Sequence, residues 1–292
     1  MRQGFRFAVR LPFCLSIFAG LLFMTAKVMA QPVSLWERNQ QTPPLADLLQ
    51  LALEKTTDLY PDSPVSPSAV MEYHEALENL LRDSGSPAIF SAPAALRLEN
   101  TFLTVRVPLL KGLSGNRLCL IRKGEQARFN PVRTAFDLNE QGLKVCQGKH
   151  EPDTEVLRRN GLQVVTSERY QDLFDKLEGG ECDCFLRSVE ELASEYPLVK
   201  NRFDTESGLL FQYYQPRFFY VSRQHPELAV RIELGLMRAL DDGSFDQLFN
   251  HYASQWLQDY QLKKRRVLPL ANPLLTDETR HLQTIKTFWY QP

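Results

Sequence analysis

Four cysteines form the most compact set of reactive side chains after residue 30: Cys119, Cys146, Cys182 and Cys184. Cys182 and Cys184 lie two residues apart on a predicted strand, so their side chains should share one face. Cys146 ends a predicted neighbouring strand. A bridge from Cys146 to Cys182 or Cys184 would contribute ~3–4 kcal/mol in the chain-entropy model. Buried free thiols are the alternative.

Neither the cysteines nor the other side chains form a pattern that predicts a metal site or a catalytic site. The Cys182-X-Cys184 pair has no nearby histidine and lacks the ligand spacing of a zinc site. The histidines His74, His225, His251 and His281 are scattered. The sequence shows no nucleophile–base pair and no phosphate loop, so we expect neither an enzyme nor a cofactor. A buried glutamate with a raised pKa is the remaining enzymatic alternative.

The elements that position these cysteines lie between residues 141 and 185. This segment alternates predicted strands at 143–148, 162–165 and 182–186 with predicted helices at 155–161 and 170–180. Strands that alternate with short helices predict a parallel, doubly wound α/β sheet with right-handed crossovers. In such sheets, ligands bind at the carboxyl ends of the strands.

The N-terminus resembles an export signal. Three arginines precede an apolar run at 11–24, and residues 28–30 are small or apolar. The apolar run is shorter than the ~20 residues of a transmembrane helix. We therefore expect residues 1–30 to be a cleaved signal peptide that directs the chain to the periplasm. An uncleaved anchor is the alternative, and an oxidising compartment would permit disulfides.

Charge and composition exclude several functional classes. The full chain has a net charge of −1, and residues 1–30 hold four positive and no negative side chains, so the remainder carries −5. This balance argues against a nucleic-acid or anionic membrane surface. The hydrophobic content of 43% is sufficient for the cores of one large or two modest globular units. We expect no segment after the signal peptide to insert into a membrane.

Several short motifs together resemble the family 3 extracellular solute-binding proteins. The matching segments between residues 90 and 260 are Gly142–Val145 with Gly148, 170–180 with Asp183, 219–222, and 234–252. The C-terminal segment resembles a branch of that family associated with ABC transporters.

The resemblance implies a type II periplasmic binding-protein fold. Two doubly wound α/β lobes would be joined by two hinge strands, at 117–122 and 213–222. Lobe one would comprise 31–118 plus 215–292, and lobe two would comprise 119–214. Such a protein closes its lobes on a small ligand. We expect a monomer whose partner is a membrane permease or a sensor.

The resemblance also suggests ligand-binding residues in both lobes. Arg97 lies nearest the position of an arginine that holds a carboxylate in the family. Lys149 occupies the loop where the family usually has Gly-Thr, and Asp153 or Thr154 would cap the helix that follows. Ser188 replaces an aspartate that binds an ammonium group, and Glu191 is a possible substitute.

Trp36 and Phe90 are the candidate aromatic walls, although core packing is the alternative for each. Because the usual threonine and aspartate are absent, a standard α-amino acid is a doubtful ligand. We therefore expect a solute-binding protein for a small polar or anionic solute. The alternative is a diverged interaction module that binds no free solute.

Overall fold

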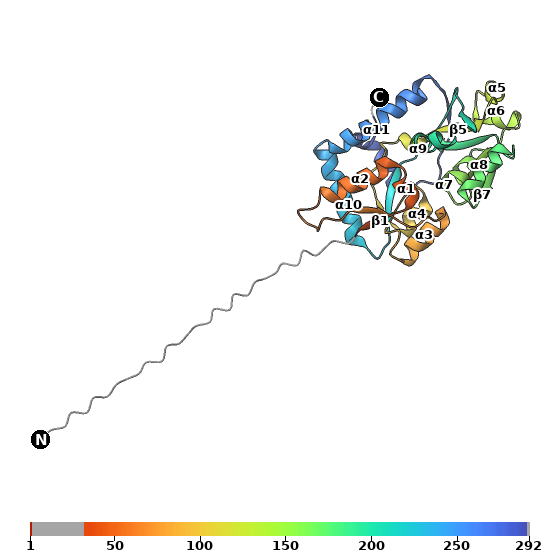
Figure 1. Ribbon diagram of the computed structural model, residues 1–292. Coiled ribbons are helices and arrows are strands. Elements are labelled where there is room, and N and C mark those ends of the chain that lie inside the picture. Colours follow the sequence, from red (N-terminus) through yellow and green to blue (C-terminus); the bar gives the residue numbers. More distant parts are fainter. Residues whose placement is uncertain (2–31, 291–292) are drawn as a thin grey trace.

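The computed structural model describes residue 1 and residues 32–290, so the predicted signal peptide lies outside the described residues apart from Met1 and its cleavage is untested. The described chain forms two α/β lobes (Figure 1). Among the described residues, no helix combines the length and apolar character that a membrane span requires.

The first sheet has the strand order β2-β1-β3-β11-β4. Strands β1, β2 and β3 are parallel, and β11 runs antiparallel to both β3 and β4. The strands are β1 (Val33–Leu35), β2 (Val65–Pro67), β3 (Ile89–Pro93), β4 (Leu103–Val105) and β11 (Arg217–Val221).

Helices that pack on the first sheet come from both ends of the chain. Pro43 and Pro44 open α2, where proline is favoured because its missing N–H needs no helical partner. Gly235 lies so close to α2 that an added Cβ would stand 2.0 Å from the carbonyl oxygen of Ala52. These helices are α1 (Glu37–Gln40), α2 (Pro43–Glu54), α3 (Tyr73–Arg82), α4 (Leu96–Thr101), α10 (Pro226–Asp241) and α11 (Ser244–Tyr260).

The second sheet has the order β12-β10-β5-β8-β6-β7, with β9 also paired to β5. Strands β7, β6 and β8 are parallel neighbours, which confirms the parallel sheet predicted for residues 141–185. The strands are β5 (Asn116–Arg122), β6 (Val145–Gly148), β7 (Val164–Ser167), β8 (Cys184–Ser188), β9 (Phe203–Thr205), β10 (Leu209–Gln212) and β12 (Arg266–Pro269).

The helices of the second lobe are short. They are α5 (Gln126–Phe129), α6 (Ala135–Glu140), α7 (Pro152–Arg159), α8 (Tyr170–Glu178) and α9 (Val189–Val199). Helix α7 begins at Pro152 with Glu151 as its N-cap residue, which corrects the expectation that Asp153 or Thr154 caps it. The side chain of Asp153 is thereby available for other contacts.

The chain crosses between the sheets just before β5, and again at residues 213–216, which lie inside the predicted hinge range 213–222. Strand β5 lies inside the second sheet and β11 inside the first. The two crossing segments meet where the N–H of Tyr213 donates to the carbonyl of Gly115 at 3.1 Å. A Cβ on Gly115 would lie 2.1 Å from the carbonyl oxygen of Tyr213, so only glycine permits this approach.

The C-terminal segment contacts both sheets. Strand β12, inside the range expected for lobe one, pairs in parallel with β10 of the second sheet. The chain then returns to the crossing segments, where the N–H of Tyr290 donates to the carbonyl of Lys111 at 2.9 Å. The elements between are α12 (Asp277–His281) and the 3-10 turns η3 (Leu282–Thr284) and η4 (Lys286–Phe288); the other two such turns are η1 (Leu113–Gly115) and η2 (Leu262–Lys264).

All four cysteines after residue 30 are paired. Cys146 joins Cys182, one of the two predicted alternatives, whereas Cys184 joins Cys119 of β5 instead of Cys146. Strand β8 lies between β5 and β6, so each neighbouring strand supplies one partner. Cys182 precedes β8 and packs in a different hydrophobic cluster from Cys184, which corrects the expectation of a common face.

Candidate functional site

A polar cavity lies between the lobes, at the carboxyl ends of strands from both sheets. Its volume is about 60 Å³, which is room for only a few water molecules. Both lobes supply its walls, as the rule for doubly wound sheets predicts. The lining residues are Trp36, Arg38, Asn39, Thr42, Tyr73, Ser91, Pro93, Glu151, Asp153, Tyr170, Arg187, Glu191, Glu195 and Arg217.

The first buried arginine of this region anchors the crossing segments. Arg117, on β5, is 1% exposed and contacts the carboxylate of Asp153 at 2.8 Å. The hydroxyl of Tyr213 donates to the same carboxylate. Burial alone would lower the pKa of Arg117, but the carboxylates of Asp153 and Glu191 outweigh it and hold the pKa above its usual value. Arg117 is therefore a permanent cation.

The second buried arginine belongs to lobe two. Arg187, at the end of β8, donates to Glu195 through Nε at 2.8 Å and through Nη2 at 2.6 Å. This two-pronged contact is the strongest geometry for an arginine–carboxylate pair. The same guanidinium lies 3.5 Å from Glu191 and 3.9 Å from Glu151. It also lies over the Phe185 ring at 4.8 Å.

The third buried arginine joins the two lobes. Arg217 opens β11 of the first sheet, and its Nη2 contacts Glu191 of α9 at 2.8 Å. Its Nε lies 3.5 Å from Glu190, a side chain without any exposed surface. Burial would raise the pKa of Glu191, but Arg187, Arg117 and Arg217 lower it well below the usual range. Glu191 is therefore ionised and holds the lobes together through Arg217.

We call these groups the cleft cluster, and its charges do not balance. Three guanidinium groups face five carboxyl groups, so the cluster has two carboxyl groups in excess. Arg38, which also lines the cavity, leaves this excess unchanged because it pairs with Glu72 at 2.8 Å. A surplus of buried charge is unfavourable unless a proton or another cation neutralises it. The cleft cluster comprises Arg117, Arg187, Arg217, Glu151, Asp153, Glu190, Glu191 and Glu195.

Burial raises the pKa of two carboxyl groups of the cluster, Glu195 and Glu151, and that of Glu151 lies near neutral pH. The Glu151 side chain is 17% exposed, and it lies at the start of α7. Burial, together with the carboxylates of Glu191 and Asp153, raises the pKa of Glu151 to about 7, because the opposing effect of Arg187 is smaller. Glu151 therefore gains or loses its proton near neutral pH.

Aromatic side chains close the side of the cleft formed by lobe one. Trp36 stacks on Phe90 with ring centroids 4.7 Å apart, and Tyr73 meets both rings edge-on. Opposite them, the Arg38 guanidinium lies 4.2 Å from the centre of the Tyr170 ring. Because Arg38 and Tyr170 come from different lobes, this contact and the Arg217 ion pair both favour the closed arrangement.

The residues predicted to bind a ligand are only partly gathered in this cleft. Trp36 and Asp153 line it, whereas Phe90 is fully buried behind Trp36. Ser188 is also fully buried, and its backbone N–H donates to Glu191 at 3.1 Å as the N-cap residue of α9. Glu191, the suggested substitute for the missing aspartate, does line the cleft.

Arg97 and Lys149 lie elsewhere. Both are exposed and line a neighbouring groove of about 380 Å³, together with Glu151. Sequence reasoning missed Arg187 and Arg217 as site residues because each lies at the end or start of an apolar strand. An arginine beside buried strand residues was the available signal, since arginine is rarely buried unless it is paired.

Comparisons with known proteins agree with this architecture. No family model and no curated protein matches the sequence. An ancestral arginine-binding protein bound to arginine is similar in structure, with a TM-score of 0.56 and 14% identity over 76% of this chain and 97% of that chain. An arginine third transport system periplasmic binding protein from Legionella pneumophila has a TM-score of 0.57 and 16% identity, over 76% of this chain and 100% of that one.

A signalling protein is similar as well. A histidine kinase sensor domain with similarity to periplasmic binding proteins has a TM-score of 0.54 and 16% identity, over 78% of this chain and 96% of that chain. These likenesses confirm at the level of fold the resemblance to family 3 solute-binding proteins that the sequence indicates. The chain therefore has the two-lobed α/β fold of the type II periplasmic binding proteins.

Proposed function

We propose that this chain is an exported binding protein that closes its two lobes on a small solute carrying a cationic group. The observation that carries the proposal is the excess of two carboxyl groups over guanidinium groups in the cleft cluster. An ammonium or guanidinium group of a solute would neutralise the excess. Several proteins of similar structure are described as arginine-binding, which is consistent with such a solute.

The same count disfavours the anionic solute expected from the sequence. Arg187 and Arg217 already have carboxylate partners at 2.6–2.8 Å. An anion would have to displace one of those carboxylates and leave it buried without its cation, which is costly. A cation at Glu151 displaces only a proton. We therefore keep the small polar solute of the sequence-based prediction and replace its anionic class with a cationic one.

Closure of the lobes would be the binding step. The cavity of about 60 Å³ is smaller than such a solute needs, so the lobes must open before the solute enters. The lobes would follow the predicted ranges 31–118 plus 215–292 and 119–214, with β12 extending the second sheet. A closed, loaded form would then be recognised by a membrane permease or a sensor, in the periplasm and as a monomer.

A thermal-shift screen with matched pairs of solutes tests this proposal. Amines and guanidines without a carboxylate, α-amino acids with basic side chains, and dicarboxylates are added separately at pH 8. A solute at 100 times its dissociation constant stabilises the chain by about 2.7 kcal/mol. We expect stabilisation by at least one cationic solute and none by the dicarboxylates.

Two variants on helix α7 locate the binding site. Glu151→Gln removes a carboxylate that lines the cleft, so it should weaken or abolish the shift. Glu155→Gln is the matched control, because Glu155 lies outside the cavity and pairs with Arg159 at 2.7 Å. Stabilisation by dicarboxylates alone, or an equal response of the two variants, would contradict the proposal.

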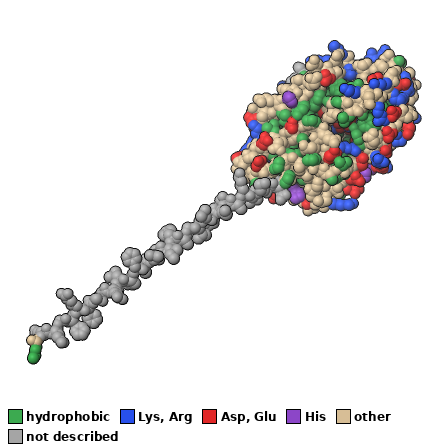
Figure 2. All heavy atoms as spheres, in the orientation of Figure 1, with side chains coloured by type: hydrophobic (Ala, Val, Ile, Leu, Met, Phe, Trp, Pro, Cys, Tyr) green, Lys and Arg blue, Asp and Glu red, His purple; other side chains and the backbone are tan. Residues whose placement is uncertain are grey.

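A second candidate function is an interaction module that binds no free solute. The observation in its favour is that Arg217, Glu191 and their neighbours already fill the cleft with ion pairs. In that case the closed form would be the resting form, and its outer surface would contact a partner. Figure 2 shows acidic and basic side chains interspersed over one face of the molecule. A screen in which no small solute changes the melting temperature would favour this function over solute binding.

A further inference from the structure

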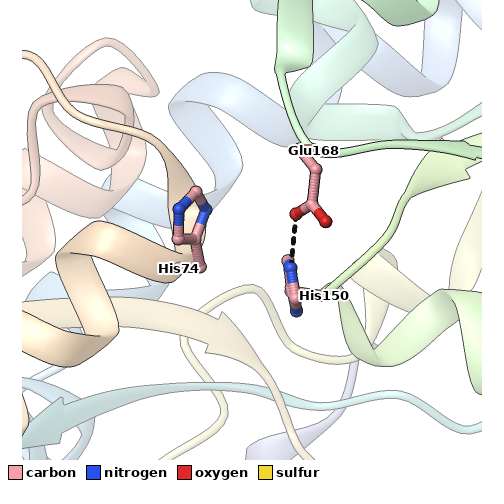
Figure 3. Close-up of side chains that lie close together, drawn as sticks. All are labelled: His74, His150 and Glu168. Atoms are coloured by element: carbon pink, nitrogen blue, oxygen red, sulfur yellow. Dashed lines mark hydrogen bonds and ion pairs between the residues drawn. The ribbon is translucent and has the colours of Figure 1, made fainter.

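Two histidines and a glutamate from different lobes meet at the rim of the cleft (Figure 3). His74 lies on α3 of lobe one, His150 in the loop after β6, and Glu168 in the loop after β7. One ligand atom from each residue lies within 4.8 Å of the other two. We call these three residues the rim triad. Sequence patterns could not predict the rim triad, because 75 residues of intervening chain separate His74 from His150.

The side chains of the rim triad face one another, as the ligands of a shared metal ion would. The Nε2 atom of His150 lies 2.5 Å from Glu168 Oε2, and the rings of His74 and His150 have centroids 5.3 Å apart. The Nδ1 atom of His74 is buried and has no hydrogen-bond partner among the described residues. A buried nitrogen without a partner is unfavourable, and a bound metal ion is one way to satisfy it.

The donor set points to a particular class of metal ion. Two imidazole nitrogens and one carboxylate oxygen suit Zn²⁺ and other late divalent transition metals better than Ca²⁺ or Mg²⁺, which prefer oxygen ligands. Ligand atoms on a tetrahedral zinc ion lie roughly 3.4 Å apart, given metal–ligand distances of about 2.0–2.1 Å. Small side-chain rotations would bring the triad to that spacing, and water would complete the coordination.

We propose that the rim triad binds a divalent transition metal ion, zinc being the probe of choice, and that the ion links the two lobes. His74 supplies the ligand from lobe one, whereas His150 and Glu168 supply those from lobe two. Because all three ligands meet only when the lobes are closed, the ion binds the closed form more tightly and shifts the population toward it. The site lies beside the cleft cluster, since His150 directly precedes Glu151, but it shares no ligand with that cluster.

Lys149 makes the proposal more specific. Its ammonium group pairs with Glu168 and competes for the carboxylate that a metal ion would use. Removal of this cation should therefore strengthen metal binding, whereas removal of any ligand should weaken it. A metal held adventitiously on the surface would show neither dependence.

Calorimetric titration of zinc chloride into the untagged, chelator-treated full chain tests the site. We expect one ion per chain and a loss of affinity of at least about 100-fold in His74→Ala and in His150→Ala, because even residues behind the ligands commonly change metal affinity by about 10–100-fold. Lys149→Ala should bind more tightly than the wild type. Zinc should also reduce the radius of gyration of the wild type in X-ray scattering.

His251→Ala is the matched control, since His251 is exposed on α11 and lies outside the triad. Its zinc affinity should equal that of the wild type. His150→Ala changes an exposed loop residue and keeps the test decisive if His74→Ala fails to fold. The proposal is overturned if zinc does not bind, if several weak sites appear, or if His150→Ala binds zinc as tightly as the wild type does.

Discussion

The two lobes meet through different kinds of side chain in the interior of the cleft and at its rim. In the interior, Arg217 of lobe one pairs with Glu191 of lobe two, and Glu191 is 17% exposed. At the rim, His74 faces His150 and Glu168, whose side chains are 34% and 48% exposed. Interior contacts rely on permanent charges in a low-dielectric setting, whereas rim contacts involve half-exposed groups that water screens. Interior substitutions should therefore change stability, and rim substitutions should mainly change ligand-dependent behaviour.

The largest effect should follow from Arg217→Met. This change removes a buried cation that contacts Glu191 and raises the excess of carboxyl groups from two to three. Breaking a buried ion pair in this way costs about 3–5 kcal/mol in free energy of unfolding. Chemical denaturation of the variant and the wild type at pH 8 measures the loss.

Glu190→Gln is the counterpart, because it lowers the excess of carboxyl groups instead of raising it. Both carboxylate oxygens of Glu190 are buried without hydrogen-bond partners among the described residues. We expect this variant to be at least as stable as the wild type. A large loss of stability in Glu190→Gln together with an unaffected Arg217→Met would mean that the cluster has no excess of negative charge.

The next largest effect should be on the pH dependence of stability, through the carboxyl group of Glu151. Because the pKa of Glu151 is raised to about 7 in the folded chain, the folded state binds a proton more tightly than the unfolded state does. The resulting stabilisation is complete below the unfolded pKa of about 4.5 and is lost as pH rises to about 7, by up to about 3 kcal/mol. The Glu151→Gln variant should lack this part of the pH dependence, as denaturation at pH 5 and pH 8 would reveal. An unchanged slope in the variant would assign the effect to another group.

A smaller effect is expected at the crossing segments. Gly115→Ala places a methyl group against the carbonyl of Tyr213 and forces the two segments apart, which should cost about 1–3 kcal/mol. Gly208→Ala is the control, because an added Cβ there would lie 3.3 Å from a carboxylate oxygen of Glu206, against 2.1 Å from the Tyr213 carbonyl oxygen at Gly115. Equal melting temperatures for the two variants would show that the crossing segments can separate at little cost.

The smallest effect should come from the rim. Glu168→Gln, measured without added metal, should leave the melting temperature within the scatter of repeated measurements, because exposed ion pairs contribute little. A destabilisation as large as that of Arg217→Met would remove the distinction between interior and rim. Differential scanning calorimetry of the variant in a chelating buffer provides the measurement.

Local patterns predicted the scaffold far better than the site. The strand–helix alternation between residues 141 and 185 predicted β6, α7, β7, α8 and β8, because each element follows from periodicity and stop signals over a few residues. Val65–Pro67 forms a strand that sequence patterns did not show. Three-residue strands form mainly through their neighbours, so they leave little local signal.

The site could not be predicted in the same way, since its contacts join residues from distant parts of the chain. Arg117, Arg187 and Arg217 meet Glu191 only after β5 and β8 become neighbours and β11 joins the other sheet. The Cys119–Cys184 bridge depends on the same strand order. Strand order is set by tertiary packing, so a residue list without that order could suggest Trp36, Asp153 and Glu191 but not the arginines beside them.

Proton release on ligand binding tests the central claim most directly. Any cationic solute that stabilises the chain is titrated at pH 7 in buffers of different ionisation enthalpy, which gives the number of protons exchanged. Because the pKa of Glu151 is about 7, a cation bound beside it should release a fraction of a proton at pH 7, and Glu151→Gln should release none. Proton uptake, or equal release by the wild type and the variant, would contradict a cation-binding cleft built around this carboxyl group.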